Sequence, residues 1–158
     1  MTKGPIGIAL FCDDVRYEID GRISAIGINP MDEIVFPREG ENFMIPVLGI
    51  VMRIIIPLDF KFDKFTVNVF REEGDAKFEI FSGTQNYSEF ASLKNTGTSE
   101  LKFWKSTIAQ RLSAVQCTPE GKIKVEMTFD DGEVQPMGAL IYKFRQEPQG
   151  NAIGISGS

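Results

Sequence analysis

The sequence contains no histidine, only two cysteines and a single tryptophan among its 158 residues. Without histidine the chain cannot build a Ser-His or Cys-His catalytic pair or a histidine proton shuttle. Two cysteines cannot form a four-thiolate zinc site, and no histidine is present to complete one. These absences remove the commonest hydrolase and metalloenzyme centres, so we expect neither an enzyme nor a bound cofactor.

Positive charge is also scarce, because 17 Lys and Arg residues face 22 Asp and Glu residues and leave a net charge of −5. Proteins that bind nucleic acid backbones usually carry an excess of positive charge. The chain has no stretch of about 20 apolar residues, the length that a membrane helix needs. The apolar run Ile6–Cys12 is too short for a secretory signal. We therefore expect a protein that is made in the cytoplasm and binds neither nucleic acid nor membrane.

The composition, 42% hydrophobic and 25% charged, is typical of one globular domain. We expect this domain to span residues 1–144. The Gly- and Ser-rich residues 145–158 are predicted to form a flexible C-terminal tail. Cys12 and Cys117 both lie beside strand-like apolar sequence, which favours buried, reduced thiols over a disulfide.

The clearest strand signal is the alternation of apolar and polar residues from Lys122 to Phe129. It leads into Asp131-Gly132, a dipeptide that favours a tight turn with positive φ at both central residues. Folding about this turn keeps the apolar residues on one face, because it pairs Met127 with Pro136, Val125 with Gly138 and Ile123 with Leu140. Pro136 cannot donate to a ladder, so a sheet edge or a bulge is expected beside it.

A second hairpin is predicted around Glu73-Gly74, after the alternating segment Phe65–Phe70. The predicted register places Val69 opposite Phe78 and Val67 opposite Ile80. Phe70 and Phe81 then fall together on the outward face, where a soluble hairpin normally carries polar groups. A third turn is expected at Asp20-Gly21, between the segments Val15–Ile19 and Arg22–Ile28, and Pro5–Cys12 is expected to form a further strand before it.

The segment Phe43–Ile56 reads FMIPVLGIVMRIII, and Arg53 is its only charged residue. As a strand it places Leu48, Ile50, Met52, Ile54 and Ile56 on one face, with Val47, Gly49, Val51, Arg53 and Ile55 on the other. Both faces are largely apolar, which is typical of a strand covered on both sides. The cover can come from another subunit or from the chain's own loops.

Residues 100–112 permit both a helix and a strand, because Leu101, Trp104, Ile108 and Leu112 recur at helical spacing. We expect a strand over Thr107–Cys117 and loops at 29–42, 82–99 and 118–121. Short strands separated by turn dipeptides predict an all-β fold. It is expected to be an antiparallel β-sandwich of about eight strands, Ig-like or C2-like, with little or no helix.

Two groups of acidic residues are candidate calcium ligands. Carboxylates at Asp13, Asp14, Asp130 and Asp131 could hold Ca²⁺ if both groups met at one end of the sandwich. Aspartate also favours turns, and the Asp131-Gly132 pair is already accounted for by its turn. We expect turn and solubility roles here before a metal site.

The aromatic residues point to dry packing, because 13 Phe accompany only three Tyr and one Trp. Tyr and Trp are typical of wet recognition surfaces, whereas phenylalanine suits a core or a permanent interface. The candidate partner interface consists of Val47, Val51, Arg53, Ile55, Phe70 and Phe81.

The N-terminal segment Phe11-Cys12-Asp13-Asp14-Val15-Arg16-Tyr17-Glu18 is followed by Gly21, Ser24, Ile26 and Gly27. This pattern resembles the signature of an uncharacterised protein family of bacteria and bacteriophages. The resemblance implies no activity. It marks Asp13, Asp14 and Arg16 as a shared structural corner or a binding point.

Together these features predict a non-enzymatic structural or interaction module of a larger assembly. Its partners would be protein subunits, either copies of itself or other chains. The family resemblance adds a bacteriophage virion component, in the capsid or associated with the tail, as the particular setting. The alternative is a C2-like sandwich that binds Ca²⁺ or a ligand through its loop carboxylates.

Overall fold

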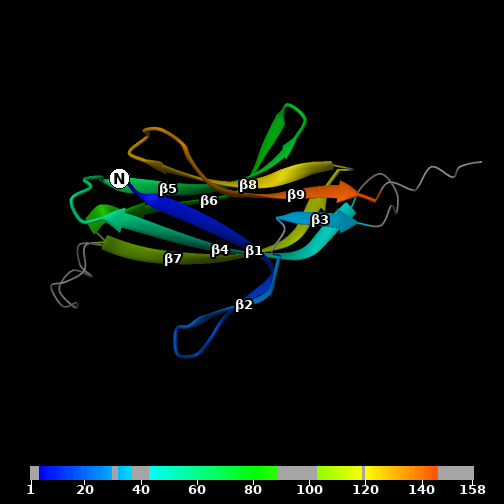
Figure 1. Cartoon of the computed structure of the whole chain (residues 1–158), viewed down its shortest axis with the longest axis horizontal. Helices are drawn as coiled ribbons and strands as arrows, with labels where there is room; N and C mark the ends of the chain where they lie inside the picture. The colour runs from blue at the N-terminus through cyan, green and yellow to red at the C-terminus, as the bar shows by residue number, and fades with distance from the viewer. Residues whose placement is uncertain (1–3, 30–31, 37–42, 89–102, 119, 146–158) are drawn as a thin grey trace, which may run out of the picture.

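The computed structural model describes residues 4–29, 32–36, 43–88, 103–118 and 120–145. These residues form two β-sheets packed face to face (Figure 1). The strands, in chain order, are β1 (Ile6–Tyr17), β2 (Ile23–Ile28), β3 (Glu33–Phe36), β4 (Phe43–Pro57), β5 (Lys64–Glu73), β6 (Ala76–Asn86), β7 (Phe103–Cys117), β8 (Glu120–Phe129) and β9 (Gln135–Phe144).

One sheet has four strands in the order β2-β1-β4-β7, and the other has five in the order β3-β9-β8-β5-β6. All neighbouring strands run antiparallel except β3 and β9, which run parallel. The predicted all-β sandwich is thus confirmed, with nine strands in the described ranges where about eight were expected.

The core lies between the two sheets, and β4 supplies its centre. The face of β4 that was predicted to point inward is buried, with Ile50, Met52 and Ile54 completely shielded from solvent. From the opposite sheet they meet a matching buried row on β5 and β8: Phe65, Val67, Val69, Ile123, Val125 and Met127. Each such side chain contributes roughly 1.5–3 kcal/mol through burial, so this interior stabilises the sandwich without disulfides.

The β8–β9 hairpin confirms the register predicted far from its turn, because Ile123 pairs with Leu140 and Val125 with Gly138. Nearer the turn the prediction is wrong, since Glu126 rather than Met127 pairs with Pro136. Met137, whose side chain is buried against the core, is the extra residue of a β-bulge beside Pro136. The bulge shifts by one residue every pair between it and the turn.

The turn of this hairpin lies one residue earlier than predicted. Asp130 and Asp131 are its central residues, with φ of 50° and 59°, and the Gly132 N–H donates to the Phe129 carbonyl at 2.8 Å. Aspartate tolerates the left-handed region better than most residues, because its short side chain can accept local hydrogen bonds. The prediction that Asp131 and Gly132 are the two central residues of the turn is therefore wrong.

The predicted register of β5–β6 is wrong. Glu73 pairs with Ala76 across Gly74, which has a φ of 58° and is the first central residue of the turn. A bulge at Ile80 then moves Phe81 opposite Val69, whose side chain is buried in the core. Phe81 therefore packs against the core instead of sharing the outward face with Phe70.

Several boundaries also differ from the predicted loops. β3 lies within residues 29–42, β6 extends to Asn86, and β8 begins at Glu120. Residues Phe103–Cys117 form one strand, so the helical spacing around Trp104 was misleading. The predicted tail beyond Arg145 and most of the predicted loop at 82–99 lie outside the described residues.

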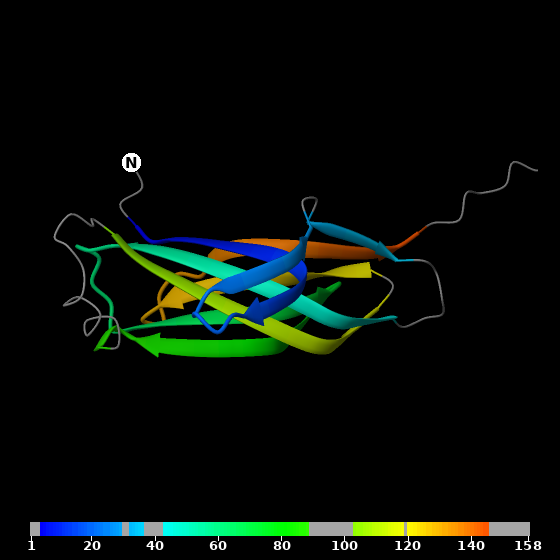
Figure 2. The ribbon, with the colours of Figure 1, turned by 90° about the horizontal axis from the view of Figure 1, so that it is seen from below.

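The β1–β2 hairpin crosses the outer face of its own sheet. β1 pairs with β4 up to Cys12, and beyond that residue it pairs only with β2. Gly49 of β4 allows the crossing, because a Cβ there would lie 2.7 Å from Val15 Cγ2. Beyond β4, the Tyr17 hydroxyl donates a hydrogen bond to the carbonyl oxygen of Ala109 on β7. Figure 2 shows the hairpin in front of β4 and β7.

Candidate interaction surface

The outer faces of the two sheets differ in chemistry. The five-stranded sheet carries a network of ion pairs along β8, in which Lys122 and Lys124 both reach Glu72, at 3.0 and 3.3 Å. Lys124 and Lys77 both reach Glu126, at 3.1 and 3.0 Å. This connected network of paired charges along β8 favours contact with water.

Glu126 is the most buried acidic side chain of this network. Burial by itself would raise the pKa of its carboxyl group, but the ion pairs with Lys77 and Lys124 outweigh burial and lower that pKa. The carboxylate therefore stays charged at neutral pH, and its two lysines are held in place over the sheet. Lys77 also lies over the ring of Phe70, 3.8 Å from its centre.

Over β1 and β4 the outer face of the four-stranded sheet is mostly apolar where the β1–β2 hairpin does not cover it, whereas Lys105 and Thr107 of the neighbouring β7 are polar and exposed. Ile6, Ile8 and Leu10 of β1 are 47%, 50% and 45% exposed. They lie directly opposite Ile55, Arg53 and Val51 of β4, and opposite residues of an antiparallel pair share one face. We call this set of six residues the β1–β4 face.

Ile28 extends the apolar surface, since it pairs with Cys12 and lies diagonally across from Leu10. Its side chain is half exposed, like those of β1. Soluble monomers rarely expose large contiguous apolar patches, and such patches usually mark contact sites. The β1–β4 face is therefore the candidate functional site.

Arg53 lies in the middle of the β1–β4 face. It is exposed, and it forms no ion pair with any residue in the described part of the chain. Ile6, Ile8 and Ile55 surround it along the two strands. The exposed Lys105 of β7 lies opposite Ile55 and diagonally across from Arg53 on the same face. The two cations provide directional contacts for a carboxylate, in addition to the burial of apolar area.

The structure distributes the predicted interface residues among three environments. Ile55 and Arg53 lie on the open part of the β1–β4 face, whereas Val51 is partly covered by the chain's own hairpin. Val47 is half-buried on β4, opposite Ser113. Phe70 and Phe81 belong to the other sheet and do not adjoin this face.

Sequence reasoning missed the most exposed part of the site, Ile6, Ile8 and Leu10. Their alternation with Gly7 and Ala9 was the available signal, because small residues alternate with large ones along the strand. Gly7 packs inward, and a Cβ there would lie 2.8 Å from Met137 Cγ. Without the structure, a strand apolar at every position reads as one buried on both faces.

The four candidate calcium ligands do not gather into one site. Asp14 lies 2.8 Å from Arg111 Nε and 3.5 Å from Arg16 Nε, and Asp13 lies against Gly27. Among the residues that the structure describes, no group of three or more His, Cys, Asp or Glu side chains is placed to hold a metal ion. The condition for a calcium site, that the two acidic groups meet, is therefore not fulfilled among the described residues.

Asp130 has a structural role at the other end of the sandwich. Its carboxylate accepts hydrogen bonds from the backbone N–H of Asp63, at 2.9 and 3.1 Å, and of Lys64, at 2.8 Å. Its own N–H donates to the Lys64 carbonyl at 3.1 Å. Asp130 thus fixes the start of β5 to the β8–β9 turn, while Asp131 forms an exposed ion pair with Lys64.

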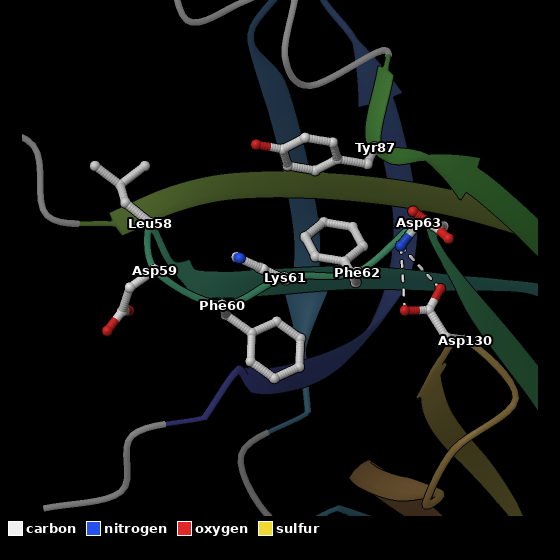
Figure 3. Close-up of a pocket in the computed structure, with 8 residues that line it drawn as sticks. All are labelled: Leu58, Asp59, Phe60, Lys61, Phe62, Asp63, Tyr87 and Asp130. Carbon is white, nitrogen blue, oxygen red and sulfur yellow. Dashed lines mark hydrogen bonds between the residues drawn. The ribbon is translucent and has the colours of Figure 1, made fainter.

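An open pocket of about 590 Å³ adjoins Asp130 and is lined by the segment Leu58–Asp63 and Tyr87 (Figure 3). Its floor is aromatic, with the ring of Phe62 in edge contact with those of Tyr87 and Phe129, both at 5.2 Å. The two hydrogen bonds drawn in Figure 3 run from the Asp63 N–H to the Asp130 carboxylate. The pocket is thus lined by aromatic rings together with the charged residues Asp59, Lys61, Asp63 and Asp130.

A buried polar cluster lies at the start of β8. Tyr142 Oη donates to Glu73 Oε1 at 3.0 Å, and Arg71 Nε lies 3.0 Å from the same oxygen. Burial, followed by the Cys117 and Glu73 charges, raises the pKa of Tyr142. Burial raises the pKa of Cys117 to about 11. The thiol and the phenol are therefore protonated at neutral pH, and neither is an activated nucleophile.

The chain matches no protein-family model and no curated protein. The resemblance of residues 11–27 to a bacterial and bacteriophage family stays a prediction. No helix in the described part of the chain is long and apolar enough to cross a membrane.

Proposed function

We propose that this protein is a non-catalytic interaction module that docks through its β1–β4 face onto another protein subunit of a larger assembly. The observation that carries the proposal is the asymmetry of the sandwich. One outer face carries a network of paired charges along β8, and the other exposes Ile6, Ile8 and Leu10 around Arg53, which forms no ion pair within the described ranges.

The expected partner has a complementary apolar surface with a carboxylate placed to meet Arg53. Burying the exposed halves of several isoleucine and leucine side chains supplies the attraction, at about 25 cal/mol per Å². The ion pair supplies orientation more than affinity, because charges at an interface mainly set register and specificity. A virion as the setting of this assembly is the finer part of the proposal, and it is supported by the N-terminal resemblance alone.

The proposal is tested with Ile8→Glu, which places a carboxylate in the centre of the β1–β4 face. Arg53 lies opposite and can pair with the new charge, so the fold is expected to survive. The matched control is Ile141→Glu on β9, where the isoleucine is 48% exposed and lies opposite Lys122. Both variants exchange an equally exposed isoleucine beside a cation, but they lie on different sheets.

The measurements are light scattering after gel filtration and binding of a hydrophobic fluorescent dye. We expect the wild type to self-associate at high concentration or to bind the dye. Ile8→Glu should lose both properties, and Ile141→Glu should keep them. A wild-type monomer that binds no dye contradicts the proposal, and so does self-association that Ile8→Glu leaves unchanged.

A further inference from the structure

The tip of the β1–β2 hairpin carries an exposed apolar residue. The Glu18 N–H donates to the Arg22 carbonyl at 2.8 Å, and the Gly21 N–H donates to the Glu18 carbonyl at 3.0 Å, so the tip is a closed turn. Tight turns usually consist of glycine, proline or short polar residues. Here Ile19 lies in the turn and is fully exposed. Figure 1 shows the hairpin projecting from the side of the four-stranded sheet, where another molecule can reach its tip.

A carboxylate adjoins this isoleucine in the sequence. Glu18 is exposed, and its side chain accepts a hydrogen bond from the Ser24 hydroxyl at 2.6 Å. Asp20, on the other side of Ile19, forms an ion pair with Arg22 at 2.6 Å. Glu18 forms no ion pair within the described residues. The tip therefore combines a fully exposed apolar side chain with a carboxylate that can pair with a cation of another molecule.

The β1–β4 face is complementary to this tip. Ile8 lies opposite Arg53, and Ile55 lies between Ile6 on β1 and Lys105 on β7. Arg53 and Lys105 are both exposed, and neither forms an ion pair in the part of the chain that the structure describes. Two such cations on one apolar surface favour a partner that brings an apolar side chain together with a negative charge. The hairpin tip provides both.

The hairpin and the open part of the β1–β4 face lie side by side on one surface. The hairpin crosses β4 at Gly49, and Arg53 lies four residues farther along the strand, at a distance of about 13 Å. Figure 2 shows β4 continuing beyond the hairpin. The surface therefore has a raised half and a low half. A two-fold axis between the halves places the raised half of each copy over the low half of the other.

We propose that the partner on the β1–β4 face is a second copy of this chain, in a two-fold dimer in which each hairpin lies on the open part of the other copy's face. Ile19 of one protomer packs against Ile8 and Ile55 of the other, and Glu18 pairs with Arg53. The contact occurs twice, so the buried area doubles and the assembly closes at two copies. This inference rests on the proposed function, because it names the partner of the same face.

The first test reverses the two charges, with sedimentation velocity over a concentration series to measure the dissociation constant of the dimer. Arg53→Glu and Glu18→Arg each bring like charges together at both contacts, so each variant alone should dimerise at least about tenfold more weakly than the wild type. An equimolar mixture of the two variants should recover the wild-type constant, because both contacts of a mixed dimer then join opposite charges. Unchanged constants in the single variants overturn the proposal, and so does a mixture that associates no better than they do.

The second test removes the apolar side chain of the tip. Ile19→Asp changes a fully exposed residue, so the monomer should fold like the wild type. Its dimer should be at least about a hundredfold weaker, because the side chain is lost from both contacts. Val134→Asp is the control, since Val134 is 52% exposed just before β9 in the other sheet. A dimer that Ile19→Asp leaves as tight as the control overturns the proposal.

The failure of this inference differs from the failure of the proposed function. A monomeric wild type whose dye binding is lost in Ile8→Glu overturns the dimer and leaves the β1–β4 face as the docking site for a different protein. Self-association that is lost in Ile8→Glu but kept in Ile19→Asp overturns the hairpin as the occupant, again with the docking face intact. A wild type that neither associates nor binds the dye overturns the docking face itself.

Discussion

The carboxylate of Asp14 lies 2.8 Å from Arg111 Nε, although the two residues are 97 positions apart in the sequence. The ion pair joins the β1–β2 hairpin to β7, which is not its neighbour in the sheet. It therefore marks where the hairpin has crossed β4. The hairpin covers one part of the outer face, partly including Val51, and leaves the rest of the β1–β4 face open.

We predict that Gly49→Ala destabilises the protein by about 1–3 kcal/mol, because the new methyl group lifts the hairpin from β4. A Cβ at this position would lie 2.6 Å from Cys12 Sγ and 3.0 Å from the backbone carbon of Asp14. Gly4→Ala is the control, since nothing lies within 4 Å of a Cβ there. Denaturant unfolding measures both changes, and equal stabilities would show that the crossing is not close.

Asp14 is expected to make folding stability depend on pH at the acid end. Its hydrogen bond with Arg111, supported by the Val15 N–H and by Arg16, lowers the pKa of Asp14 below its ordinary value of 3.8. A carboxyl group with a lowered pKa stabilises the fold above the ordinary value, and that contribution is lost as pH falls through the folded pKa. Asp14→Asn should thus be less stable than the wild type at neutral pH, with the difference shrinking below pH 3.8. Unfolding curves across this range measure it, and a constant difference would contradict the assignment.

Asp130→Asn should cost about 1 kcal/mol or more, because a neutral amide replaces the carboxylate that holds the N–H groups of Asp63 and Lys64. Asn tolerates the positive φ at this position, so the turn itself is retained. Asp131→Asn is the control, since Asp131 has a similar φ but only an exposed ion pair. Thermal unfolding should separate the two variants. A millimolar calcium addition that raises the stability of the wild type, but not of Asp130→Asn, would revive the metal hypothesis.

Both cysteines should resist alkylation in the folded protein. Burial raises the pKa of Cys117 from 9.0 to about 11, which lowers its thiolate fraction at neutral pH about a hundredfold. Burial, opposed by backbone hydrogen bonds and supported by the Asp13 charge, also raises the pKa of Cys12. Mass spectrometry after iodoacetamide treatment should find two modifications only once the protein is unfolded. Rapid modification of the native protein would contradict the burial of these thiols.

The sequence predicted the fold class, the inward face of β4 and the pairing of the β8–β9 hairpin far from its turn, since these follow from the strict alternation of apolar and polar residues. It predicted an edge or a bulge beside Pro136, where Met137 bulges, but not the resulting change of register. The bulge at Ile80 was not predicted, because an extra residue leaves the composition of a strand unchanged. Phe81 was therefore placed on the wrong face. The hairpin crossing was also beyond prediction, because the glycine that permits it, Gly49, belongs to a strand far from Val15 in the sequence.

The candidate site was half predicted for a related reason. β4 reads as apolar on both faces, and Ile55 and Arg53 were assigned correctly to its outer side. Which part of that side stays uncovered depends on how far the hairpin reaches, and only the three-dimensional contacts of Tyr17 and Asp14 determine this.

The most direct measurement is the broadening of isoleucine methyl signals by a soluble paramagnetic agent, recorded on the monomeric protein by NMR. Ile8 should broaden nearly as strongly as Ile19, which is fully exposed at the hairpin tip, and Ile54 in the core should not broaden. That result would establish an apolar surface left open to a partner. An Ile8 signal as well protected as that of Ile54 would contradict the account.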